Sequence, residues 1–470
     1  MDDGLWRWSA VDLADAIAAR RVSSREATES ALARLAAVNP RINAVVDVLA
    51  EEALAAAAAA DAALARGESG GPLHGVPVTV KINVDYAGRP TTTGVVAFKD
   101  DIAAADSPPI ASLRAAGAVI IGRTNVPAFC ARFFTDNDLH GRTLNPWDAG
   151  RTPGGSSGGA AAAVATGIGA IAHGTDRAGS IRYPAYACGV VGLRPSFGRV
   201  AAYSANPSVE ATLASQLMSV QGPLARSVGD VALGLRGMMR GDARDPWWMP
   251  APMLDETERP LRVAVFEGTA GAAVDPAVAA AVRRAAGWLA EAGCEVAPAT
   301  PPAVAELADM FFSMVKTEEG EGTSRAIERL GDDALRRARA GTMARATKYT
   351  LEAYVDALGR RTAILRQWQA FLEQHDALLL PVSYRAPLPI DEDQKGDDAV
   401  ARMIDAHEPM LAVSMLGLPS LAMPTGIDGT VPTGVQIVSG RFKEALCLRI
   451  GAMIEAACPP ATPIDPAGPL

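Results

Sequence analysis

Two short loops of the sequence combine glycines with serines in a pattern that suits nucleophilic catalysis. The first loop, residues 153–159, reads Pro-Gly-Gly-Ser-Ser-Gly-Gly and contains Ser156, and the second, residues 174–184, contains Ser180. Glycines permit positive φ angles and close approach of backbone N–H groups to a ligand, so a serine among them can be exposed on a sharp turn. Either loop alone is equally compatible with an ordinary turn, because such short motifs are not specific.

A lysine joins the two loops into one mechanistic hypothesis. Lys81 follows the apolar run 76–80, where a buried charge is costly unless the amine has partners or a task. Together, Lys81, Ser156 and Ser180 supply a base, a relay hydroxyl and a nucleophile without any histidine. The amine can accept a proton only if its pKa falls from about 10.4 towards roughly 7–8, through desolvation and nearby cations.

Other interpretations of the polar residues fit less well. Residues 154–158 match a Gly-x-Ser-x-Gly nucleophile elbow, but no apolar strand precedes them, and the contexts of His375 and His407 do not support a histidine triad. A phosphate loop would end in Gly-Lys-Ser/Thr, which does not follow either loop. The remaining histidines, His74 and His173, have no metal-ligand spacing, so we expect neither a metal nor another cofactor.

Helical and strand-like segments alternate along the chain. Apolar residues at helical spacing predict a pair of helices over residues 9–38, and an alanine-rich helix is predicted over residues 51–66. The alternation predicts one large α/β domain over residues 1–470, with α/β/α layers around a central mixed sheet. The expected strands are the short runs 76–80, 118–121, 261–266, 377–380 and 435–438.

Two other helical regions bear on the candidate site. Residues 158–172 are too short and too weakly apolar to span a bilayer, and we interpret them as one buried helix. Residues 301–375 are nearly all helix-forming and are interpreted as a helical insert that shapes the substrate pocket. The aromatic side chains that we expect to line this pocket are Phe133, Phe134, Phe311 and Phe312, with Tyr349 and Trp368 as further candidates.

Composition narrows the range of partners and compartments. A net charge of −9 and a pI near 5.3 argue against nucleic acid and favour a small-molecule ligand. Five widely spaced cysteines without a Cys-x-x-Cys pair suit a reducing compartment and are interpreted mainly as core residues. The first residues resemble no secretory signal, so we expect a cytoplasmic protein without a membrane partner. A homodimer stays open as an alternative to a monomer.

At the loops described above, the chain resembles the amidase-signature family. Three diagnostic segments occur in order: Gly-Val-Pro-x-x-x-Lys at residues 75–81, the glycine-serine loop at 153–159, and Gly-Thr-Asp-x-x-Gly-Ser-Ile-Arg at 174–182. Further matches extend over nearly the whole chain outside the helical insert. Such ordered agreement is far more specific than any one motif.

The resemblance implies a triad of one lysine and two serines. Lys81 would be the base, Ser156 the central serine preceded by a cis peptide bond, and Ser180 the nucleophile, 24 residues after Ser156. Ser157 would support this network by hydrogen bonding. The other implied groups are a structural pair, Asp176 and Arg182, and an oxyanion hole made by the backbone N–H groups of Arg177, Ala178, Gly179 and Ser180.

Two residues depart from the family pattern beside the nucleophile. Ala178 stands where a glycine is usual, and Arg177 replaces a small or apolar residue. If position 178 needs a positive φ, its Cβ would cost about 1–2 kcal/mol. These departures leave open a catalytically silent relative that only binds ligands.

The implied activity is cleavage of C–N bonds in small aryl or alkyl amides through an acyl-enzyme on Ser180. Carbamates (urethanes) and esters are further candidate substrates, because the attack on the carbonyl is the same. An alternative enzyme is the glutaminase-type subunit of a tRNA-dependent amidotransferase, which would need charges that bind a free amino acid, together with a second protein chain as its partner.

Overall fold

The strands of the protein form one sheet that runs through the whole molecule. The computed structural model describes residues 4–68, 70–205, 211–255, 257–269, 271–319 and 321–467. Within these ranges, eleven strands are ordered β1-β3-β2-β4-β6-β5-β10-β11-β9-β7-β8. Strand β2 pairs parallel with β3 and β4, whereas β4 pairs antiparallel with β6, so the predicted mixed sheet is confirmed. The strands are β1 Val45–Val48, β2 Pro77–Lys81, β3 Val119–Thr124, β4 Ile171–Asp176, β5 Val191–Arg194, β6 Val220–Ala225, β7 Arg262–Val265, β8 Glu295–Pro298, β9 Ala377–Pro381, β10 Ser420–Asp428 and β11 Val431–Val438.

Helices cover both faces of this sheet, which explains why its central strands are apolar on both sides. Successive side chains of a strand point to opposite faces. In β9, Leu378 and Leu380 belong to one buried apolar cluster and Leu379 to the other. The predicted α/β/α layering is therefore confirmed. The helices are α1 Ala10–Ala18, α2 Ser24–Ile42, α3 Ala50–Ala65, α4 Pro108–Ala115, α5 Gly158–Ala165, α6 Arg182–Cys188, α7 Leu213–Met218, α8 Val228–Met238, α9 Pro276–Glu291, α10 Val304–Glu318, α11 Glu321–Leu330, α12 Asp333–Arg345, α13 Leu351–Gln374, α14 Asp397–Ala406, α15 Glu408–Leu416 and α16 Glu444–Ala457.

The predicted helical segments agree with the structure except at one position. The pair over residues 9–38 corresponds to α1 and α2, where Ser23 and Glu26 form a capping box at the start of α2. The region 301–375 contains the four helices α10–α13. The single buried helix predicted over residues 158–172 is wrong, because α5 ends at Ala165 and strand β4 begins at Ile171. Apolar residues continue across this boundary because both elements are buried.

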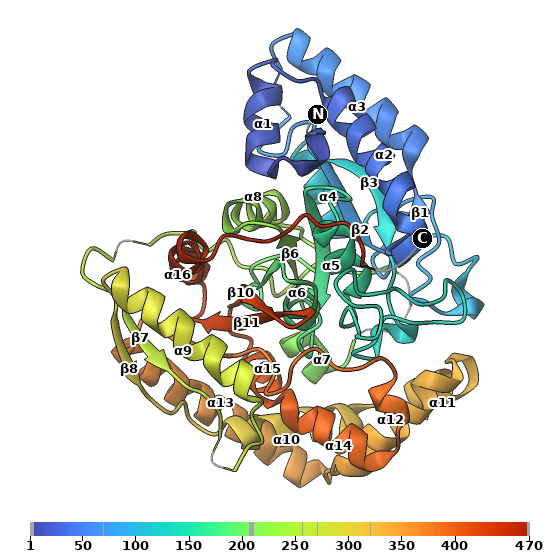
Figure 1. Ribbon diagram of the computed structural model, residues 1–470. Coiled ribbons are helices and arrows are strands. Elements are labelled where there is room, and N and C mark those ends of the chain that lie inside the picture. Colours follow the sequence, from blue (N-terminus) through green and yellow to red (C-terminus); the bar gives the residue numbers. More distant parts are fainter. Residues whose placement is uncertain are drawn as a thin grey trace.

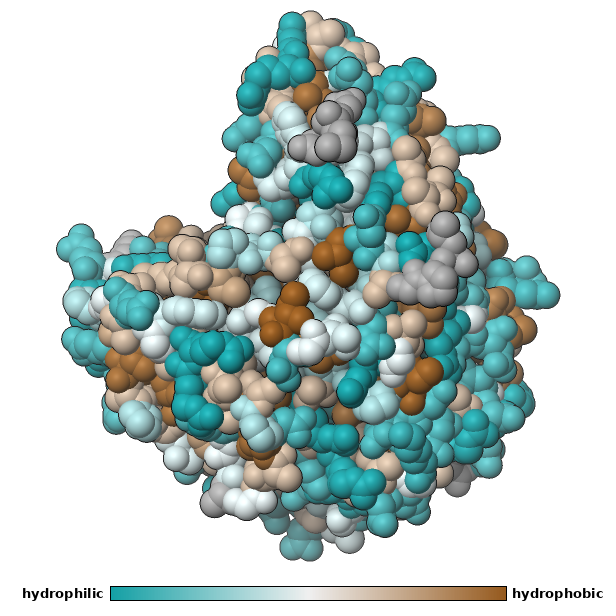
Figure 2. All heavy atoms as spheres, viewed as in Figure 1, coloured by the Kyte–Doolittle hydropathy of each residue, from teal (hydrophilic) through white to brown (hydrophobic). Residues whose placement is uncertain are grey.

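The arrangement of the layers places the two glycine-serine loops near the middle of the molecule. Helices α1–α3 lie at one end, α10–α14 lie at the other, and α5 and α6, which follow the two loops, lie between them (Figure 1). On the face drawn in Figure 2, hydrophobic residues occur as separate spots among polar ones. Among the helices of the described ranges, none is long and apolar enough to cross a bilayer.

Candidate active site

The register of β2 and β4 positions the lysine of the candidate triad. These strands are parallel neighbours, so their carboxyl ends, Lys81 and Asp176, lie at the same edge of the sheet. Nζ of Lys81 lies 2.7 Å from Oγ of Ser156 and 2.7 Å from Oγ1 of Thr175. No part of Lys81 is exposed, and this burial lowers the pKa of its amine to about 8, although Asp176 opposes the shift. A substantial fraction of the buried amine is therefore neutral near pH 8.

The loop before α5 presents the central serine to this amine. The peptide bond between Gly155 and Ser156 is cis, as the resemblance implies. A Cβ atom on Gly155 would lie 2.5 Å from the backbone oxygen of Arg132, so only glycine fits at this position. The backbone N–H of Ser157 donates to the carbonyl of Ser180 at 3.2 Å, which connects the two loops. These contacts bring Ser156 and the segment of Ser180 together.

The backbone of the segment around Ser180 answers whether Ala178 needs a positive φ angle. Gly179 has a φ of +102°, whereas Ala178 is not among the described residues with positive φ. The Cβ of Ala178 therefore causes no strain of the kind considered above. Ser180 is 9% exposed. Among the hydrogen bonds of the described ranges, none joins the hydroxyls of Ser156 and Ser180, so this second step of the relay stays a prediction.

Asp176 organises the nucleophile segment through a buried ionic network. Its carboxylate accepts hydrogen bonds from the backbone N–H of Gly179 at 2.9 Å and from Nε of Arg182 at 3.0 Å. Nη1 of Arg194 donates to the same carboxylate at 3.0 Å. Burial alone would raise the pKa of Asp176, but the two guanidinium groups hold it well below its usual range. The predicted pair of Asp176 and Arg182 therefore exists, as part of a larger cluster.

Three residues near the site were not predicted from the sequence. Thr175 accepts the second hydrogen bond of Lys81, and Arg194 completes the ionic cluster from β5. Cys130, one of the five cysteines that were interpreted mainly as core residues, is partly exposed and lies near Lys81. Thr175 adjoins Asp176 in the third motif, so its position was a usable signal. Cys130 and Arg194 lie outside the three motifs, so the sequence contained no signal that placed them at the site.

The aromatic residues predicted to line a substrate pocket occupy different environments. Phe134 and Phe311 are 3% and 1% exposed and belong to the buried core. Phe133 and Phe312 are partly exposed, and Phe133 stacks on His407 with ring centroids 4.4 Å apart. Phe133 and Phe312 are thus the two of this set with accessible surface, and their contact with substrate stays a prediction. The other two candidates differ likewise: Trp368 is buried and Tyr349 is half-buried against the core.

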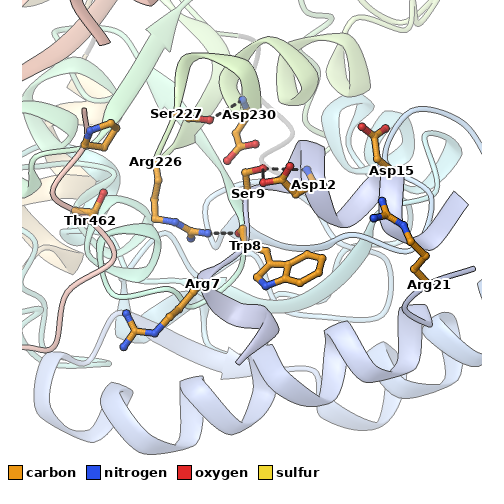
Figure 3. Close-up of a pocket in the computed structure, with 11 residues that line it drawn as sticks. Arg7, Trp8, Ser9, Asp12, Asp15, Arg21, Arg226, Ser227, Asp230 and Thr462 are labelled. Atoms are coloured by element: carbon orange, nitrogen blue, oxygen red, sulfur yellow. Dashed lines mark hydrogen bonds between the residues drawn. The ribbon is translucent and has the colours of Figure 1, made fainter. Parts of the chain in front are cut away.

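A separate cavity lies away from these groups. It has a volume of about 660 Å³ and lies among α1, the start of α8 and the C-terminal segment (Figure 3). Its buried carboxylate, that of Asp230, accepts a hydrogen bond from the backbone N–H of Val11 at 3.1 Å. This carboxylate therefore holds the first turn of α1, which is a structural role. The residues that line the cavity are Arg7, Trp8, Ser9, Asp12, Asp15, Arg21, Arg226, Ser227, Asp230, Pro460 and Thr462.

Comparison with known proteins identifies the family of the chain. The family model described as Amidase matches residues 26–448. The chain belongs to the amidase-signature family. This amidase is 43% identical to the indoleacetamide hydrolase of Bradyrhizobium diazoefficiens over 96% of the chain and 86% of that protein. It is 34% identical to a glutamyl-tRNA(Gln) amidotransferase subunit of Moorella thermoacetica, over 96% of both proteins.

The fold of the amidase also matches solved structures. A bacterial aryl acylamidase of the amidase-signature family superimposes with a TM-score of 0.84, over 96% of this chain and 97% of that one, at 26% identity. The family, the fold and the hydrolysis of amide C–N bonds are thereby established for this chain. Within the described ranges, no cluster of three or more histidine, cysteine or acidic side chains is arranged to hold a metal ion.

Proposed function

We propose that the amidase cleaves small amides through an acyl-enzyme on Ser180, with Lys81 and Ser156 as the proton relay. The observation that carries this proposal is the hydrogen bond of 2.7 Å between the buried Lys81 amine and Ser156. A buried amine with a pKa of about 8 is a suitable general base near neutral pH. Histidine is not needed for such a relay.

The chemistry follows from this arrangement in two stages. Neutral Lys81 takes the proton of Ser156, which takes the proton of Ser180 as its Oγ attacks the amide carbon. The C–N bond then breaks, and the proton passes from Lys81 through Ser156 to the leaving amine. Water next attacks the acyl-enzyme with the same relay as base, which releases the acid and frees Ser180.

The negative charge of the tetrahedral intermediate needs nearby N–H donors. We assign this task to the backbone N–H groups of Arg177, Ala178 and Ser180. The N–H of Gly179, the fourth group expected from the sequence, instead donates to Asp176 and, with the positive φ of Gly179, fixes the loop. Each such donor contributes on the order of 10²–10³ in rate. The absence of a positive φ at Ala178 supports an active enzyme over a silent binding relative.

Small aryl or arylalkyl amides are the substrates that we favour. The names of two relatives, an indoleacetamide hydrolase and an aryl acylamidase, support this class. The partly exposed aromatic side chains of Phe133 and Phe312 are suited to such groups. Aryl carbamates and esters are proposed as slower alternatives, because only the leaving fragment differs. The similarity to an amidotransferase subunit makes free glutamine the necessary competitor in the assay.

One experiment tests the mechanism and the substrate class together. The wild-type enzyme is assayed with arylacetamides, anilides, aryl carbamates and glutamine, and is labelled with a fluorophosphonate probe. We expect turnover of the aryl amides and mass-spectrometric localisation of the probe on Ser180, with both lost in Ser180→Ala. As a control, Ser23→Ala removes a distant helix cap and should retain both. Full activity of Ser180→Ala would remove this residue from the role of nucleophile.

A further inference from the structure

Arg177 is a cation immediately beside the reacting serine. It lies between Asp176 and Ala178 in the segment that leads to Ser180, where the family pattern has a small or apolar residue. Backbone atoms of this segment serve the proposed oxyanion hole, but that role needs no particular side chain. The guanidinium group therefore calls for an explanation of its own.

The guanidinium of Arg177 has few partners for a buried charge. Nη1 donates to Oγ of Ser215 at 3.1 Å. Among the ion pairs within the described ranges, none includes Arg177. Burial lowers the pKa of Arg177, whereas Glu319 and Cys130 oppose the shift. A guanidinium held in this way lacks the paired anion that normally compensates its desolvation.

The two carboxylates that attract Arg177 are engaged elsewhere. Glu318 accepts hydrogen bonds from the backbone N–H of Ala214 at 2.8 Å and from the hydroxyl of Tyr354. Glu319 forms an ion pair with Arg339. Both carboxylates are thus tied to α7, α12 and α13 rather than to the guanidinium. Within the described ranges, neither carboxylate forms a hydrogen bond or an ion pair with Arg177.

Arg177 is also close in the chain to the candidate nucleophile, three residues before Ser180. It keeps part of its surface exposed, as do the adjacent Ala178 and the nearby Cys130. Burial raises the pKa of the Cys130 thiol, and the nearby Lys81, Ser156 and Arg177 oppose the shift. A partly exposed arginine is therefore carried by the segment of Ser180, the residue that would attack the substrate carbonyl.

We propose that Arg177 binds a carboxylate on the substrate and makes the amidase selective for small amides that carry such a group. This inference rests on the proposed function, because it names a feature of the substrate for the same site. A guanidinium presents a planar fork of donors that matches the two oxygens of a carboxylate. The anion would supply the charge partner that the protein does not provide in the described ranges.

A binding experiment separates this inference from the proposed mechanism. The Ser180→Ala variant is titrated calorimetrically with 4-carbamoylbenzoate and with its neutral isostere 4-nitrobenzamide. The same pair is measured in the double variant with Arg177→Gln, and the result is the ratio of the two dissociation constants. We expect Arg177→Gln to reduce the preference for the anion by at least about tenfold and to leave 4-nitrobenzamide within about threefold.

Two matched variants exclude a merely structural role. Ser215→Ala removes the hydrogen bond to Arg177 but keeps the guanidinium, so the preference for the anion should persist. Arg177→Lys keeps the charge but loses the fork, so part of the preference should remain. An unchanged ratio in Arg177→Gln, or an equal loss in Ser215→Ala, would overturn the inference.

The proposed mechanism is tested by a different measurement, the labelling and turnover of the wild-type enzyme. If the wild-type enzyme shows neither turnover nor fluorophosphonate labelling at Ser180, the role of Ser180 is refuted. The binding ratios would still decide whether Arg177 recognises a carboxylate. In the active enzyme, the same selectivity should appear in kcat/KM for 4-acetamidobenzoate against 4-nitroacetanilide, as a ratio that falls at least about tenfold in Arg177→Gln.

Discussion

A hydrogen bond of 2.7 Å joins Nζ of Lys81 to Oγ of Ser156, although the two residues are 75 positions apart in the chain. The pairing of β2 with β4 and the sharp loop before α5 create this contact. It links an amine of lowered pKa to a hydroxyl, which is the pairing that a proton relay requires.

The rate of hydrolysis should depend on the protonation of Lys81. The pKa of this amine is about 8, and the neutral form is the base, so kcat/KM should rise with pH and level off above about 8. Lys81→Met should reduce kcat/KM by more than about 10²-fold and abolish this rise. A pH–rate profile between pH 6 and 9.5 checks both. A flat wild-type profile across this range would argue against a lysine base.

The free energy of unfolding should increase with pH because of the lowered pKa of Lys81. Its folded pKa of about 8 lies below the ordinary value of 10.5, so the unfolded chain binds more protons between these values. The free energy of unfolding should therefore gain about 3 kcal/mol from this group as the pH rises from 8 to 10.5. Urea denaturation measures this gain, which Lys81→Met should lose and the exposed control Lys348→Met should retain.

Arg194 should matter more to stability than its distance from the motifs suggests. Both Arg194 and its partner Asp176 are 0% exposed, and removal of one member leaves a buried charge less compensated. We expect Arg194→Met to lower the free energy of unfolding by about 3–5 kcal/mol. Denaturant titration checks this, with Arg25→Met as a control, because the Arg25–Glu29 pair is on the surface and should contribute less than about 1 kcal/mol. Equal effects of the two variants would contradict the prediction.

Gly155 should be irreplaceable in the loop of Ser156. A methyl group there would lie 2.5 Å from the oxygen of Arg132, so Gly155→Ala must move the backbone that carries the central serine. We expect kcat to fall at least about tenfold, since displacement of a catalytic group by about 1 Å can cost on the order of 10²-fold. In contrast, Gly287 of α9 has open space around it, and Gly287→Ala should keep full activity and add about 0.5–1 kcal/mol of stability. Steady-state kinetics and thermal denaturation compare the two variants.

Cys130 should make the amidase sensitive to thiol reagents. It is partly exposed and lies beside Lys81 and Ser156, so the group that iodoacetamide adds would obstruct the site. Burial raises the pKa of this thiol, and the thiolate is the reactive form, so alkylation should be slow at neutral pH and faster at alkaline pH. We expect inactivation that is absent in Cys130→Ser and unchanged in Cys458→Ser, whose thiol is also partly exposed. Residual activity after mass-spectrometric proof of alkylation at Cys130 checks this. Undiminished turnover by the alkylated enzyme would place the thiol outside the path of the substrate.

The local sequence was enough to predict much of the fold and the candidate triad. Apolar periodicity located α1 and α2, alanine-rich composition located α3, and short β-rich runs located β2, β3, β7, β9 and β11. The same approach failed over residues 158–172, where helix and strand are both buried and apolar composition cannot separate them. Lys81, Ser156 and Ser180 stood out because each lies in a motif whose residue types carry chemistry.

Only the tertiary structure decided which further groups meet these three. The sheet order brings Arg194 of β5 to Asp176 of β4, and chain folding brings Cys130 to Lys81. Such contacts depend on strand order and on packing between distant segments, which spacing along the chain does not encode. The hydrogen bond of Arg177 to Ser215 likewise depends on the packing of distant segments. Sequence therefore predicted the candidate reacting groups, because their residue types lie in motifs, and the packing of distant segments specified their electrostatic surroundings.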